Sequence, residues 1–116
     1  MGSIAPPAVD SARVGVIASP EALPVAERAA AALRADGHEL VVVAVDEAAR
    51  LGRVYGIVAL GGPQAAAAAR SAAPVGVYLR VQALPATDPD AWEALALAAV
   101  RATAVAVAPP GIGMCG

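Results

Sequence analysis

Hydrophobic residues in this chain gather in short, nearly continuous runs that are separated by alanine-rich segments. The runs are RVGVIAS at 13–19, HELVVVAV at 38–45, VYGIVAL at 54–60, PVGVYLRV at 74–81 and TAVAVA at 103–108. Runs of this length that are rich in valine are typical of parallel strands covered on both faces. The pattern therefore predicts five strands.

Helical signals lie between the runs. The segment 23–35 has a proline in its first turn and Gly37 as the left-handed residue after its end. A nearly all-alanine segment, 63–72, begins with a proline, which suits the first position of a helix. Two further helical segments have aspartates as N-caps: a short one at 46–53 with Asp46 as its cap, and a long one from Asp90 with Asp88 or Asp90 as its cap.

Strand and helix thus alternate along the chain, which favours a parallel sheet wound on both sides by right-handed crossovers. We expect a three-layer α/β/α sandwich with a five-stranded parallel sheet. The 116 residues suffice for one domain. Residues 1–12 are interpreted as a flexible N-terminal arm and 13–116 as a single α/β domain.

The composition of the chain limits where the protein is expected to be located and which kinds of partner it can bind. Hydrophobic residues make up 59% of the chain and charged residues only 16%, so homo-oligomerisation is a natural way to cover apolar surface. No run reaches the roughly 18 apolar residues that a membrane span requires, and the start of the chain has no features of a secretory signal. We therefore expect a cytoplasmic protein that does not bind membranes. The basic residues are all scattered arginines, so nucleic-acid binding is not expected.

Several enzyme classes are excluded by residue types that the chain lacks or nearly lacks. Without lysine it can form neither a Schiff base nor a phosphate-binding P-loop. A single histidine and the single cysteine, Cys115, leave no basis for a metal cluster or an internal disulfide. The sequence predicts no metal and no cofactor.

Candidate ligand contacts come from the carboxyl ends of the predicted strands, because open α/β sheets bind ligands there. The pair Gly61 and Gly62 follows a strand and precedes a helix, so backbone N–H groups at that turn can meet an anionic ligand. The turn after the first strand and the stretch after the fourth strand are expected to face the same site. The predicted binding residues are Ser19, Pro20, Gly61, Gly62, Gln64, Gln82 and Ala83.

Four stretches carry a family resemblance. They are RVGVIASPEALPVAERAAAAL, GIVALGGPQAA, APVGVYLRVQAL, and ATDPDAWEALALAAV followed by RATAVAVAPPGIG. Taken in this order they resemble the class I phosphoribosylaminoimidazole carboxylase (PurE) family, and the related domain of the nickel-pincer cofactor carboxylase. The resemblance covers about residues 13–113.

The resemblance implies a PurE-like, flavodoxin-like fold, and carboxylation, decarboxylation or mutase-type chemistry on an aminoimidazole ribonucleotide or a similar small heterocycle. It also implies a small anionic or nucleotide-like ligand and a homo-oligomer, an octamer in that family. Gln82 coincides with a glutamine of the family's pattern, which supports its place among the binding residues.

The chain departs from the family where chemistry takes place. The family has its catalytic histidine after the glycine turn, whereas this chain has Ala65, and the family's Ser-Asp pair in the first turn is replaced by Ser19 and Glu21. Alanine cannot hold and return a proton. An active enzyme would therefore have to use Glu21, Asp46 or Glu47 as its catalytic residues.

Two other interpretations stay open. The first is a catalytically inactive PurE-like relative that binds a nucleotide or serves as an oligomeric assembly module, which the missing histidine favours. The second is a flavodoxin-like or receiver-like module that shares only the alternation of strands and helices. A receiver would need a lysine, so this interpretation ranks last.

Overall fold

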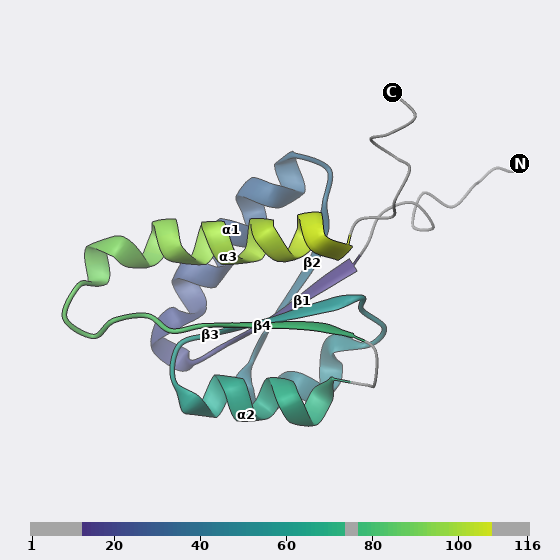
Figure 1. The fold of residues 1–116 in the computed structure, drawn as a ribbon, viewed down its shortest axis with the longest axis horizontal. Helices are drawn as coiled ribbons and strands as arrows, with labels where there is room; N and C mark the ends of the chain where they lie inside the picture. Colours follow the sequence, from purple (N-terminus) through teal and green to yellow (C-terminus); the bar gives the residue numbers. More distant parts are fainter. Residues whose placement is uncertain (1–12, 74–76, 108–116) are drawn as a thin grey trace, which may run out of the picture.

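The computed structural model describes residues 13–73 and 77–107, so the predicted arm at 1–12 lies outside the described residues. Its centre is a four-stranded, all-parallel sheet with the strand order β2-β1-β3-β4, the order of a flavodoxin-like fold (Figure 1). The strands are β1 (Arg13–Ala18), β2 (Glu39–Ala44), β3 (Gly56–Leu60) and β4 (Tyr78–Gln82).

Helices cover both faces of this sheet and make three layers, as the alternating pattern predicts (Figure 1). One face packs against α1 (Leu23–Ala35) and α3 (Trp92–Val107). The other face packs against α2 (Pro63–Ala72) and the 3-10 segment η4 (Val45–Leu51). Two short 3-10 turns, η3 (Pro20–Ala22) and η5 (Pro89–Ala91), lead directly into α1 and α3.

The core follows from the alternation of side chains along each strand. Val14 and Val16 of β1 point into the layer formed with α1 and α3, whereas Ile17 points toward α2 and η4. All three are fully buried. Because the chain has no phenylalanine, both layers are filled by valine, leucine, isoleucine and many alanines, which let the helices approach the sheet closely.

The end of α1 shows how directly a local signal sets an element boundary. Gly37 has a φ of 97°, and its N–H donates to the carbonyl of Arg34 at 3.0 Å, while the N–H of His38 donates to the carbonyl of Leu33 at 3.1 Å. These two bonds form a Schellman motif, which uses a left-handed glycine to satisfy the last carbonyls of a helix. The predicted helix 23–35 and its glycine stop are confirmed.

The predicted fifth strand at 103–108 is wrong over residues 103–107, because α3 continues as a helix to Val107. Thr103 donates its hydroxyl to the carbonyl of Ala99 at 2.9 Å, a bond that a helix allows four residues back. Thr103 and Val107 lie one turn apart and both pack over Gly56, at the start of β3. α3 therefore ends beside the amino ends of the strands, and the sheet has four strands in the described residues rather than five.

Smaller differences concern the starts of helical segments. Asp46 is not an N-cap, because η4 already begins at Val45 and Ala44 occupies the cap position. The residues after Asp88 form the 3-10 turn η5 before α3 begins at Trp92. Of the helices in the described residues, none combines the length and the apolar character needed to cross a bilayer.

Candidate functional site

The strand order creates a switch point between β1 and β3. The chain leaves β1 through α1 toward β2, and it leaves β3 through α2 toward β4, so the two connections lie on opposite faces of the sheet. Their divergence opens a crevice beyond the carboxyl ends of β1 and β3, which is where flavodoxin-like folds bind ligands.

A crevice of about 220 Å³ lies at this point. Its walls come from the turn after β1, the glycine pair after β3, the segment after β4 and the start of α3. The residues that line it are Ser19, Glu21, Ala22, Gly61, Gly62, Leu84, Ala86 and Trp92. Four of the sequence-predicted site residues, Ser19, Glu21, Gly61 and Gly62, are thus brought together.

Ser19 and Gly61 form the floor of this switch-point crevice. The Ser19 N–H donates to the carbonyl of Leu60 at 3.1 Å, and the Gly61 N–H donates to the carbonyl of Gln82 at 3.2 Å, so the ends of three strands are tied together. Gly61 has a φ of 116°, and a Cβ at this position would lie 2.1 Å from Ser19 Oγ. Only glycine fits, both for its backbone conformation and for this close approach.

The side chain of Ser19 lines the crevice without capping the turn that follows it. The residue is only 5% exposed, and although it occupies the N-cap position of η3, its side chain makes no capping hydrogen bond. The position of Ser19 in the crevice lining makes its hydroxyl available to a bound molecule.

The amino terminus of α2 adds backbone donors. The N–H groups of Ala65 and Ala66 both donate to the carbonyl of Gly62, at 3.1 and 3.4 Å, and Pro63 has no N–H. The first turn of α2 contains no acidic residue, and Gly62 provides no side-chain cap. The N–H groups of Gly62 and Gln64 are therefore the donors that this helix end leaves for a ligand.

Glu21 gives the crevice its charge. It is exposed, and it is the only charged side chain among the described residues that line the crevice. It also lies in the turn that leads into α1, where a negative charge interacts favourably with the positive end of the helix dipole. The crevice therefore combines hydrogen-bond donors on one wall with a carboxylate on another.

No family model, curated protein or solved structure matches the chain. The site is accordingly interpreted from its own geometry and chemistry. The described residues contain no group of three or more histidine, cysteine, aspartate or glutamate side chains that could hold a metal ion.

Sequence reasoning missed the apolar wall of the crevice. Trp92 donates its indole N–H to the carbonyl of Pro85 at 2.9 Å, which fixes the ring at the start of α3. The ring also packs on the core, together with Leu84. The signal that could have indicated this wall is the tryptophan that directly follows the loop after the fourth predicted strand.

The remaining predicted binding residues lie at the margins of the crevice or beside it. Gln82 contributes its backbone carbonyl to the glycine turn, while its side-chain Nε2 donates to the carbonyl of Ala83 at 2.9 Å. Gln64 is exposed in the first turn of α2, and Pro20 and Ala83 are also exposed. Their side chains do not contribute to the crevice lining.

Asp46 and Glu47 lie elsewhere. Asp46 lines a separate hollow of about 290 Å³ between η4 and α2, together with Ala68 and Ser71. Glu47 is exposed and forms an ion pair with Arg50 at 3.4 Å. Among the three predicted catalytic carboxylates, only Glu21 lines the switch-point crevice.

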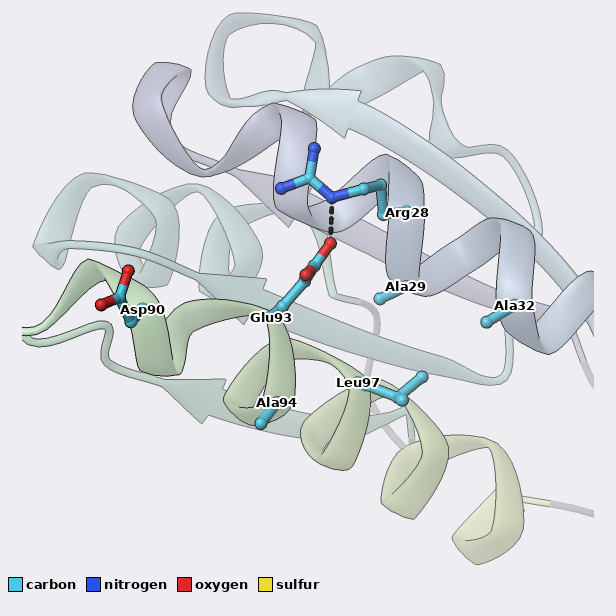
Figure 2. Close-up of a pocket in the computed structure, with 7 residues that line it drawn as sticks. All are labelled: Arg28, Ala29, Ala32, Asp90, Glu93, Ala94 and Leu97. Carbon is cyan, nitrogen blue, oxygen red and sulfur yellow. Dashed lines mark hydrogen bonds and ion pairs between the residues drawn. The ribbon is translucent and has the colours of Figure 1, made fainter.

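A shallow groove of about 460 Å³ runs between α1 and α3 on the outer surface (Figure 2). Arg28 and Glu93 form an ion pair across it, and Ala29, Ala32 and Leu97 supply its apolar side chains. Exposed ion pairs of this kind contribute little to stability. The groove lacks buried polar groups, and it joins two helices rather than the ends of strands.

Proposed function

We propose that this chain binds a small organic molecule in the switch-point crevice, as a PurE-like relative that has lost the family's catalytic histidine. The observation that carries the proposal is the side chain of Ser19, a residue only 5% exposed that lines the crevice and makes no capping bond. The backbone donors at the start of α2 and the apolar wall formed by Leu84 and Trp92 support it. Few polar groups set among apolar walls are typical of small-molecule sites.

Binding can be followed directly, because Trp92 is the only tryptophan of the chain and it lines the crevice. Carboxyaminoimidazole ribonucleotide is the first compound to titrate, because the resemblance implies a nucleotide-like ligand, and a compound that binds in the crevice is expected to change the tryptophan emission and to raise the melting temperature. Ser19→Ala is expected to weaken binding about tenfold, since it removes a hydrogen-bond donor. Ser71→Ala, an exposed serine outside the crevice, should leave affinity unchanged. Equal losses in the two variants would contradict the assignment of Ser19.

A second candidate function is carboxylation, decarboxylation or mutase-type chemistry on an aminoimidazole ribonucleotide or a similar heterocycle. The observation that favours it is the presence of Glu21 in the crevice, because it is the one carboxylate among the described residues that line it and could act as a general acid or base. Turnover of carboxyaminoimidazole ribonucleotide, followed by its ultraviolet absorbance, is expected to fall at least 100-fold in Glu21→Gln on this mechanism. Binding without turnover in the unmodified protein would leave the binding function alone.

We also propose that the chain self-associates through the outer face of α3. The family resemblance implies that the oligomer is an octamer. Ala94, Ala98, Arg101 and Val105 follow each other at spacings of four, three and four, and all are exposed. Val105 is 65% exposed. A helix that is apolar on nearly all sides is normally buried.

Charge complementarity supports a second copy of this chain as the occupant of that face. Arg101 lies toward the end of α3, whereas Asp90 lies just before its start. Antiparallel pairing of two such helices about a twofold axis near Ala98 brings the arginine of each copy toward the acidic end of the other. The alanines allow the two backbones to approach closely.

A mass measurement tests this interface. The unmodified protein is expected to be oligomeric at micromolar concentration by sedimentation velocity. Val105→Glu is expected to dissociate the oligomer and so lower the mass of the sedimenting species, because it places a carboxylate in an apolar contact. Val81→Glu changes another exposed valine, on the edge strand β4, and should leave the mass unchanged. Dissociation by the Val81 variant alone would assign the contact to the sheet edge instead of α3.

A further inference from the structure

The walls of the switch-point crevice differ in the chemistry that they offer. Ser19 and Gly62 both line one wall of it, at the start of α2, where a hydroxyl and a backbone N–H group can hold a hydrogen-bond acceptor or an anion. Ser19 is more than nine-tenths buried, and its Oγ faces the space beside Gly61 that a side chain would otherwise fill. This end favours a carboxylate-sized group.

Glu21, in contrast, favours a positively charged group on the ligand. Its carboxylate lines the same crevice two residues after Ser19, and within the described residues it takes part in no ion pair. No arginine or histidine of the described residues lines the crevice. A purely anionic ligand would therefore bring a second negative charge close to Glu21, and like charges repel each other.

A purely cationic ligand is also poorly matched. It would satisfy Glu21, but it would leave the Ser19 hydroxyl and the backbone donors without an acceptor, at the cost of desolvating them. Only a molecule that carries both a positive and a negative group satisfies both ends. Between them, Ala22, Leu84 and Ala86 with the ring of Trp92 form an apolar wall.

We propose that the ligand of the crevice is a small zwitterion with an apolar substituent, of the class of apolar α-amino acids. Its carboxylate binds Ser19 and the start of α2, its ammonium group pairs with Glu21, and its side chain contacts Leu84 and Trp92. The size agrees, because a crevice of about 220 Å³ is smaller than the roughly 300–1,000 Å³ typical of sites for larger ligands. This inference rests on the proposed binding function of the same crevice.

A matched series of ligands tests the charge requirement with the full chain. L-leucine carries both groups, 3-methylbutan-1-amine lacks the carboxylate, and 4-methylpentanoate lacks the ammonium group, while all three retain the same branched side chain. L-phenylalanine with its corresponding amine and acid provides a second series. Tryptophan emission from Trp92 reports binding, and calorimetry gives the affinity.

The expected result is that at least one of the two amino acids binds, and that its amine and its acid each bind at least about tenfold more weakly. Glu21→Gln is expected to abolish the preference for the amino acid over its acid, and Ser19→Ala to abolish the preference over its amine. Glu27→Gln, an exposed glutamate on α1 outside the crevice, should change neither preference.

Two results would overturn the zwitterion assignment and are separable from failure of the binding function. If the acid alone binds as tightly as the amino acid, Glu21 does not contact the ligand, although the crevice still binds. If neither amino acid binds but carboxyaminoimidazole ribonucleotide does, the crevice takes a different ligand class. Absence of any response from Trp92 to all of these compounds would contradict both proposals.

Discussion

Gly61→Ala is expected to destabilise the protein by at least about 2 kcal/mol in urea denaturation. The backbone of Gly61 has a φ of 116°, which L-residues rarely adopt, and the new methyl group would lie 2.1 Å from Ser19 Oγ and 2.9 Å from Ser19 Cβ. Relief of this contact requires the turn after β1 to move away from the end of β3. The variant protein should therefore bind its ligand more weakly, in addition to being less stable.

The neighbouring glycine supplies the matched control. Gly62 has a φ of −91°, and no atom lies within 4 Å of the position that a Cβ would take. Gly62→Ala should therefore cost less than about 1 kcal/mol, mainly because alanine is a poorer N-cap than glycine. Similar losses for the two variants would show that Gly61 and Ser19 are not in close contact.

Gly56→Val is expected to lower the free energy of unfolding by about 1–3 kcal/mol, because it overpacks the contact between β3 and α3. A Cβ at this position would lie 2.9 Å from Thr103 Cγ2 and 3.0 Å from Val107 Cγ1. The same substitution would be neutral or favourable if the segment 103–107 did not cover Gly56, since valine suits a strand better than glycine does.

A second substitution identifies the atoms responsible. Val107→Ala in the Gly56→Val background should recover part of the lost stability, because it removes one of the two colliding methyl groups. Val105→Ala in the same background should recover none, since Val105 is 65% exposed and lies on the outer face of the helix. Equal recovery in both double variants would argue against the register of α3.

Local signals were sufficient for much of the fold. The bounds of α1 and α2 agree with the sequence expectation, because proline marks the first turn of each and Gly37 ends α1. The strands β1, β2 and β3 also lie within their predicted runs. In each of these elements, hydrophobic pattern and turn chemistry indicate the same boundary.

The end of α3 could not be predicted in this way. Thr103, Val105 and Val107 alternate with alanines, which is a strand-like pattern. The helix nevertheless continues because no glycine or proline interrupts it before residue 108, and because Thr103 and Val107 find a matching depression over Gly56. That depression is a tertiary feature, so the competition between helix and strand was decided by packing rather than by propensity.

The candidate site was predictable only where residues that follow two different strands are brought together because those strands are neighbours in the sheet. Ser19 and the two glycines follow β1 and β3, which are neighbours in the sheet, and they line one crevice at the carboxyl ends of those strands. Asp46 also follows a strand, but β2 lies at the edge and the chain turns under the other face, so Asp46 lines a different hollow. The contribution of Trp92 depended on the path of the long segment after β4.

The walls of the crevice come from the turn after β1, from the glycine pair after β3, from the segment after β4 and from the start of α3. No single hairpin or helix pair contains the complete set, so the crevice exists only when β1, β3 and β4 are aligned and α3 is seated. The fraction of protein with ligand bound would then depend on the fraction that is completely folded as well as on the concentration of ligand. A molecule bound there would stabilise the packing of these elements against one another, and local unfolding of any of them would release it.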